Sequence, residues 1–146
     1  LVGSEMCIRD SPIGVADIKR KGKDVTVVSF GKIIKEAFKA ADELEKEGIE
    51  CEVIDLRTLR PIDYDTVLES VKKTNRLVVL EEAWPFGNIS TDISHKVQNE
   101  IFDFLDAPVE KVNNADTPTP YSPVLLEEWL PNSDQVIKAV KKVLYI

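Results

Sequence analysis

Two adjacent carboxylates, Glu81 and Glu82, are the side chains of this sequence best suited by type to acid–base chemistry. They come directly after the apolar run at residues 77–80 and precede Trp84. This places them at the end of a predicted central strand, where open α/β sheets bind ligands. Adjacent residues at a strand end point in opposite directions, so the pair does not form a catalytic dyad. We expect one carboxylate to cap or pair locally and Trp84 to pack at an interface.

Three further residues could carry chemistry, but each lacks the neighbours that its chemistry needs. His95 is the single histidine, lies off the apolar stripe of its predicted helix, and has no ligand set or nucleophile that the spacing brings to it. Cys51 sits in an apolar alternation and is predicted to be a buried thiol. Gly31 comes after a strand, yet phosphate-binding loops need several glycines. The sequence therefore predicts no catalytic, cofactor-binding or metal-binding residue.

Composition limits the class of protein. The chain has 146 residues, of which 43% are hydrophobic and 31% charged, and a net charge of −7. These values predict one soluble globular domain with neither a membrane nor a nucleic acid as its partner. Residues 1–11 lack the features of a secretion signal and differ in character from the rest of the chain. We interpret residues 1–11 as an adapter-derived segment and residues 12–146 as the domain.

Four short apolar runs predict strands. They are bounded by turn residues or charges and are rich in β-branched side chains, as buried strands are. The last of them is polar enough to lie near a sheet edge. A stretch with three prolines, residues 117–123, is predicted to be irregular. The predicted strands cover residues 24–30, 50–56, 77–80 and 109–112.

Apolar residues at helical spacing predict four helices between and after these strands. Asp63 is predicted to cap the second helix, Asn88 or Ser90 the third, and Ser133 the last. Alternating strands and helices predict a three-layer α/β/α fold with a mostly parallel sheet, because parallel strands need crossovers and both faces need cover. The predicted helices begin near residues 33, 64, 89 and 133, and the first and third extend to residues 44 and 105.

From about Pro12 to Ile146 the chain resembles the last domain of the beta chain of pyruvate dehydrogenase and of its branched-chain and acetoin relatives. The match is ordered along the chain and departs from the family in residues 86–92, which are less glycine-rich here. The matching segments are residues 25–28, 52–63, 70–79, 81–82, 84–85, 105–109 and 115–116, with Pro118, Pro120 and Tyr121.

The resemblance implies the transketolase C-terminal fold, with about five strands of which one is antiparallel. It implies that the full enzyme decarboxylates a 2-oxo acid and passes the acyl group to a lipoyl arm. Pyruvate is the expected acid, and a branched-chain acid or acetoin stays open. In this family thiamine diphosphate and magnesium are bound by the alpha chain and the preceding domain of the beta chain, so this fragment is expected to bind neither and to be inactive alone.

The resemblance also implies partners. These are an alpha subunit and a second beta subunit in a heterotetramer, with Trp84, Pro85 and Phe86 as apolar anchors of the subunit interface. A dihydrolipoyl acyltransferase would dock at Asp106 and at Ile146, which carries the terminal carboxylate. Alternatively, Asp106 only caps the turn next to it. The expected location is the cytoplasm, or the mitochondrial matrix in a eukaryote.

Two alternatives stay open. The first is the corresponding domain of a transketolase or a deoxyxylulose phosphate synthase, although the Leu-Asp-Ala-Pro sequence at residues 105–108 and the Pro-Tyr pair ending at Tyr121 favour the dehydrogenase. The second is a free-standing, flavodoxin-like binding module that uses the turn at Gly31 for a phosphorylated ligand.

Overall fold

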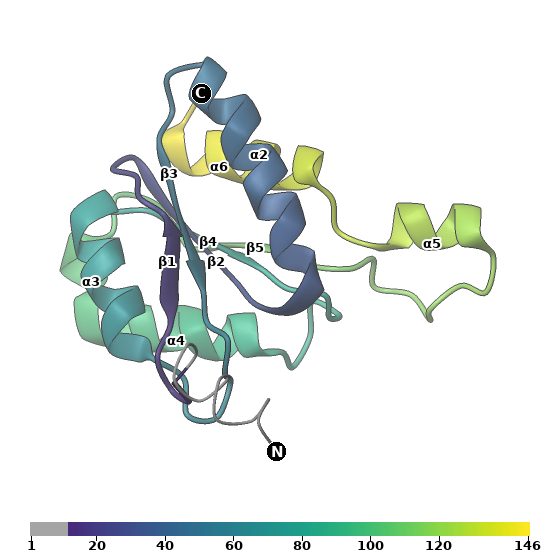
Figure 1. The fold of residues 1–146 in the computed structure, drawn as a ribbon, viewed down its shortest axis with the longest axis horizontal. Helices are drawn as coiled ribbons and strands as arrows, with labels where there is room; N and C mark the ends of the chain where they lie inside the picture. The colour runs from purple at the N-terminus through teal and green to yellow at the C-terminus, as the bar shows by residue number, and fades with distance from the viewer. Residues whose placement is uncertain (1–11) are drawn as a thin grey trace, which may run out of the picture.

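The computed structural model describes residues 12–146, and the predicted adapter-derived segment, residues 1–11, lies outside the described residues. The sheet has five strands in the order β1-β3-β2-β4-β5 (Figure 1). β1 pairs antiparallel with β3, and the other neighbours are parallel. The predicted α/β fold with a mostly parallel sheet is therefore confirmed. The strands are β1 (Asp17–Arg20), β2 (Val25–Ser29), β3 (Cys51–Asp55), β4 (Leu77–Leu80) and β5 (Glu110–Val112).

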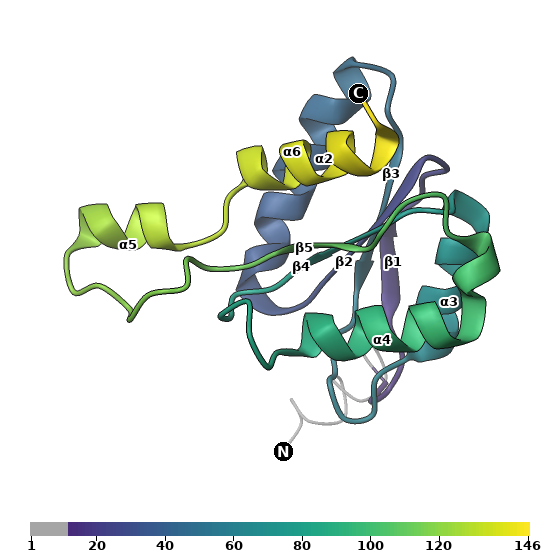
Figure 2. The same cartoon turned by 180° about the vertical axis from the view of Figure 1, so that it is seen from behind.

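Helices cover both faces of the sheet and make the three layers seen in Figures 1 and 2. α2 (Ile34–Lys46) and α6 (Ser133–Leu144) pack together on one face, and α3 (Tyr64–Thr74) and α4 (Ile89–Ile101) on the other. Single 3₁₀ turns, η1 (Gly31–Ile33) and η2 (Phe102–Phe104), precede α2 and come after α4. Among the described residues, no helix is long and apolar enough to cross a membrane.

The central strands β2 and β4 are buried along their whole length. Their residues alternate between two apolar cores. Val27 and Leu80 face the core under α2 and α6, whereas Val28 and Val79 face the core under α3 and α4. A strand with helices on both faces needs apolar residues on both, which explains the continuous apolar runs in the sequence.

Two predicted helix caps can be compared with the structure. Asp63 caps α3 as predicted, and its carboxylate accepts a hydrogen bond from the Thr66 amide at 3.1 Å. The prediction of Ser133 as the cap of the last helix is wrong. Asn132 has the extended backbone of a cap and accepts from the Gln135 amide, while the Gln135 side chain accepts from the Asn132 amide. This reciprocal pair is a capping box, and it places Ser133 in the first helical turn.

Three further predictions need correction. The third helix ends at Ile101 rather than near residue 105, because the chain tightens into η2 and then turns away. α5 (Pro123–Trp129) was not predicted, because it has only seven residues and directly follows the proline-rich stretch. Its first residue is the last proline of the stretch predicted to be irregular, and proline is well tolerated at that helical position. β1 was not read from the residues, since it is a short, partly exposed edge strand.

Candidate subunit interface at the carboxyl edge of the sheet

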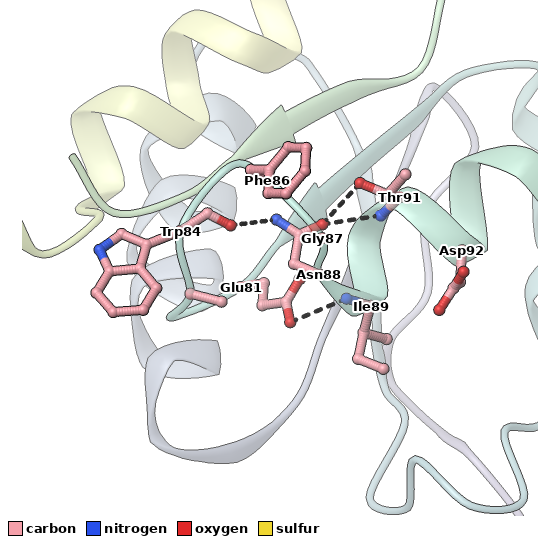
Figure 3. A pocket seen from close by; sticks show the side chains of 9 residues that line it. Glu81, Trp84, Phe86, Gly87, Asn88, Ile89, Thr91 and Asp92 are labelled. Carbon is pink, nitrogen blue, oxygen red and sulfur yellow. Dashed lines mark hydrogen bonds between the residues drawn. The ribbon is translucent and has the colours of Figure 1, made fainter. Parts of the chain in front are cut away.

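The segment after β4 begins with a buried carboxylate. Glu81 is 4% exposed, and its carboxylate accepts a hydrogen bond from the Ser90 amide at 2.8 Å. It also accepts one from the Ile89 amide at 3.3 Å (Figure 3). Both amides belong to the first turn of α4, where the helix dipole favours a negative charge. Glu82 is exposed. The expected local capping role is therefore confirmed for Glu81, and the two carboxylates do not face one another.

Asn88 closes the loop of residues 84–88, called here the aromatic loop. Its side-chain oxygen accepts from the Thr91 amide at 3.0 Å, and its side-chain nitrogen donates to the Trp84 carbonyl (Figure 3). Of the two caps that the sequence offered, Asn88 is the one that is used. One side chain thus fixes both the start of α4 and the first residue of the loop.

Lys111 on β5 holds the loop from the opposite side. Its ammonium group donates to the Pro85 carbonyl at 3.1 Å and to the Thr91 hydroxyl at 2.9 Å. Sequence reasoning missed this residue, because nothing in a polar three-residue strand links it to a loop more than twenty residues earlier. The loop is therefore tied to both β5 and α4.

The rings of the aromatic loop are exposed although its backbone is fixed. Trp84 is 51% exposed and Phe86 is 89% exposed. Figure 3 shows the two rings lying apart rather than stacked, beside an open pocket of about 460 Å³ that Glu81 also lines. The Trp84 indole donates to the Thr117 carbonyl at 2.9 Å. A fixed backbone that presents aromatic rings to solvent has the form of a binding surface.

The second predicted contact site, for an acyltransferase, lies at the other end of the strands. The Asp106 carboxylate pairs with Arg76 at 3.1 Å, a contact that the sequence did not indicate. The Tyr145 hydroxyl donates to the Asp106 carbonyl at 3.3 Å, and Ile146 is 73% exposed. The fold therefore brings Tyr145, the residue that follows α6, beside Asp106.

The remaining candidates are placed as predicted. His95 is exposed on α4, with its Nε2 atom 2.9 Å from the Asn99 side-chain nitrogen. Cys51 is buried, and burial raises the pKa of its thiol to about 12, so it is not a nucleophile at neutral pH. Within residues 12–146, no three His, Cys, Asp or Glu side chains gather as a metal site would require.

Comparison with known proteins decides the family. The model of the family described as "Transketolase, C-terminal domain" matches residues 14–136. The chain belongs to this family. A solved structure titled "Split gene transketolase, inactive beta4 tetramer" is 34% identical, with a TM-score of 0.80 over 90% of this chain and 43% of that one. The fold implied by the resemblance is therefore confirmed.

Curated relatives extend the comparison to subunits. The chain is 49% identical over 138 residues to the pyruvate dehydrogenase E1 component subunit beta of Rickettsia felis, covering 94% of this chain and 42% of that protein. It is 49% identical over 133 residues to the acetoin:2,6-dichlorophenolindophenol oxidoreductase subunit beta of Cupriavidus necator, covering 91% and 39%. The chain thus spans about two fifths of the length of these relatives.

Proposed function

We propose that this chain is the C-terminal assembly domain of the beta subunit of a thiamine-diphosphate-dependent 2-oxo acid dehydrogenase, with pyruvate as the expected acid. The observation that carries the proposal is 49% identity over 94% of the chain to a pyruvate dehydrogenase beta subunit. The identity to the acetoin:2,6-dichlorophenolindophenol oxidoreductase subunit beta is also 49%, so an experiment has to distinguish the two substrates. The proposed location is the cytoplasm, or the mitochondrial matrix in a eukaryote.

The described residues do not fit a site for the cofactor. Magnesium diphosphate needs several convergent oxygen ligands, and among residues 12–146 no three His, Cys, Asp or Glu side chains gather to supply them. The proposal therefore assigns thiamine diphosphate and magnesium to the other parts of the enzyme, and it gives this domain no catalytic step. Its role is to hold the other subunits in place.

The aromatic loop is the proposed anchor of the contact with a second beta subunit in the heterotetramer. Trp84 and Phe86 are exposed aromatic side chains of the kind that anchor interfaces, and Pro85 between them is held through its carbonyl by Lys111. Because the loop is already fixed, little conformational entropy would be lost when a partner binds.

Asp106 and Ile146 form the proposed docking site for a dihydrolipoyl acyltransferase. The Asp106 side chain is 53% exposed even though it pairs with Arg76, so one side of the carboxylate stays open to a basic group of the partner. The Tyr145 hydroxyl donates to the Asp106 carbonyl, so the residue before Ile146 contacts Asp106. Charge-assisted contacts of this kind supply specificity and weaken in salt.

A domain exchange tests the assembly role. The matching part of a pyruvate dehydrogenase beta subunit is replaced by residues 12–146, and the chimera is co-expressed with its alpha subunit. We expect a heterotetramer with thiamine-dependent turnover of pyruvate, whereas this chain alone should show none. A chimera that folds but fails to bind the alpha subunit contradicts the proposal, as does cofactor-dependent turnover by this chain alone.

The docking site is tested in the same chimera by calorimetry with the acyltransferase. Asp106→Asn and removal of Ile146 should each weaken binding, with strong salt dependence. Asp103→Asn is the matched control, because Asp103 is also an exposed carboxylate of the same region. Equal affinities for all four proteins would exclude Asp106 and Ile146 from docking.

A further inference from the structure

The Arg76 side chain bridges two segments that are far apart in the sequence. Its Nη2 atom lies 3.1 Å from the Asp106 carboxylate oxygen Oδ2, and its Nε atom donates to the Val143 carbonyl at 3.1 Å. Asp106 belongs to the turn between η2 and β5, whereas Val143 belongs to the last turn of α6. A guanidinium group presents its donors in one rigid plane, so the two contacts fix that turn and that helix end relative to each other.

The backbone of Arg76 is itself held next to the sheet. Its carbonyl accepts from the Thr26 amide at 2.9 Å, which joins it to the central strand β2. The same carbonyl accepts from the Thr74 hydroxyl at 3.1 Å. Only 25% of the Arg76 side chain is exposed. The guanidinium group therefore extends from a fixed point of the fold.

Asn75 fixes the backbone of the turn that carries Asp106. The Asp106 amide donates to the Asn75 carbonyl at 2.9 Å, and the Asn75 side-chain nitrogen donates to the Phe104 carbonyl at 2.8 Å. Asn75 has a φ of 61°, the left-handed conformation that asparagine tolerates at the end of a helix. Because the backbone is already fixed, Arg76 is left to set the direction of the Asp106 carboxylate.

Arg76 orients this carboxylate without saturating it. The contact uses the oxygen Oδ2, and among residues 12–146 the other oxygen, Oδ1, forms no ion pair. The Asp106 side chain is 53% exposed. An ionised carboxylate can accept about four hydrogen bonds. Oδ1 of Asp106 is therefore open to a donor from another molecule.

The residues after α6 have one defined geometry. Tyr145 has a φ of 61°, and its amide donates to the Lys142 carbonyl at 3.2 Å. The Ile146 amide donates to the Lys141 carbonyl at 3.1 Å. These two bonds form a Schellman motif, a common way for a helix to end. Since Arg76 holds the last turn of α6, the direction of Ile146 depends on the same guanidinium group as that of the Asp106 carboxylate.

We propose that Arg76 is the positioning residue of the acyltransferase docking site. It holds Asp106 and the end of α6 in register, so that a basic group of the partner meets Oδ1 while Ile146 contacts the same partner. The inference rests on the proposed function, because that function supplies the partner.

The proposal predicts a result opposite in sign to that of charge alone. Loss of the Arg76 cation makes the docking surface more negative, which by itself would strengthen attraction to a basic partner. Loss of positioning separates the two docking contacts and weakens binding. The sign of the change therefore distinguishes a positioning residue from a competing cation.

Calorimetry with the acyltransferase in the chimera measures that sign. Arg76→Gln should weaken binding by about tenfold. Arg76→Lys keeps the charge but lacks the planar fork, so it should weaken binding to a similar extent. Arg20→Gln is the matched control and should leave the affinity unchanged. The Arg20 side chain is 21% exposed, forms two ion pairs and lies on β1, at the edge of the sheet farthest from β5. Unchanged or tighter binding of Arg76→Gln, or full affinity of Arg76→Lys, overturns the inference.

A mutant cycle separates positioning from a general loss of structure. In a chimera that carries Asp106→Asn and lacks Ile146, Arg76 has no docking contact left to position. Arg76→Gln should then change the affinity by about twofold or less. A loss as large as that in the unaltered chimera overturns the inference.

Amide hydrogen exchange of this chain tests the geometry without a partner. Arg76→Gln should speed exchange of the Tyr145 and Ile146 amides by about tenfold, whereas exchange of the Val27 amide in β2 should be unchanged. Unaltered exchange at both terminal amides overturns the inference. If exchange accelerates but Asp106→Asn and removal of Ile146 leave the acyltransferase affinity unaltered, the proposed docking site is wrong and the positioning of the helix end by Arg76 stands.

Discussion

Buried polar side chains are hydrogen-bonded more completely at one end of the parallel strands than at the other. At the amino end, Glu52 is 1% exposed and its carboxylate accepts from the Ser70 hydroxyl at 2.6 Å, the Gly22 amide at 3.3 Å and the Lys73 ammonium. The Thr26 hydroxyl bonds to Ser70 at 2.7 Å and continues the network. Such a saturated buried network stabilises one arrangement of its elements.

At the carboxyl end of the strands, the hydrogen bonding of buried polar atoms is less complete. Within residues 12–146, Ser29, Asn113 and Asn114 each have a buried polar atom without a hydrogen-bond partner. All three end strands or come directly after them, at the edge where Trp84 and Phe86 are exposed. The comparison indicates that a complete buried network stabilises the amino end, whereas the carboxyl end leaves buried polar atoms unsatisfied beside the exposed rings of the aromatic loop.

Removal of the Glu52 carboxylate should have the largest effect. Glu52→Ala leaves the Ser70 hydroxyl and the Gly22 amide without their acceptor, so we expect a loss of about 3 kcal/mol in the free energy of unfolding. Urea unfolding monitored by circular dichroism measures it. Glu69→Ala, an exposed change on the same side of α3, should cost about 0.5 kcal/mol or less. Equal losses for both variants would show that the network does not stabilise the amino end.

Removal of the capping carboxylate of Glu81 should have the second largest effect on stability. Glu81→Ala removes the acceptor of two amides at the start of α4, and we expect a loss of about 2 kcal/mol by the same measurement. Glu82→Ala, at the adjacent exposed position, should change the free energy of unfolding by about 0.5 kcal/mol or less. A larger loss at Glu82 than at Glu81 would contradict the assigned cap.

Low pH should reduce the stabilisation that Glu52 supplies at the amino end of the strands. Burial alone would raise the pKa of Glu52, but hydrogen bonds from Lys73, Ser70 and Gly22 outweigh it and hold the pKa below its usual value. A lowered folded-state pKa contributes stability that is complete above the unfolded-state value of about 4.3 and is lost as the pH falls through the folded-state pKa. The difference in unfolding free energy between the unaltered chain and Glu52→Gln should therefore shrink below about pH 4.3. A difference that is constant down to pH 3 would oppose this.

The smallest effect on stability should come from the aromatic loop. Phe86 is 89% exposed, so Phe86→Ser should leave the free energy of unfolding within about 0.5 kcal/mol of the original. The contact between the two beta subunits of the chimera should nevertheless weaken. A large loss of stability would show that this side chain belongs to the domain rather than to a contact surface.

Continuous apolar runs and strong capping signals made much of the fold predictable. The apolar runs of β2 and β4 can only be buried on two faces, and Asp63 stands before a clear apolar stripe. α5 has only seven residues and buries none of them, and β1 has only Ile18 as an apolar side chain. Elements that make few core contacts leave little trace in the hydrophobic pattern, which explains why these two were missed.

The candidate interface was predictable only in part. Exposed aromatic residues after a central strand were visible in the sequence, as was a capping carboxylate. The contacts that fix them were not, because Lys111 reaches Thr91 across twenty residues and Arg76 reaches Asp106 across thirty. Such pairs depend on strand order, and the periodicity of each segment carries no information about strand order.

The shared carbonyl of Thr117 has a spectroscopic consequence. The chain contains two tryptophans, and both indoles donate to this one atom. Tryptophan fluorescence therefore reports the base of the segment formed by residues 115–131 rather than the sheet. Far-ultraviolet circular dichroism reports the helices and strands. If the emission changes at a lower urea concentration than the ellipticity, then residues 115–131 detach while the rest of the domain stays folded.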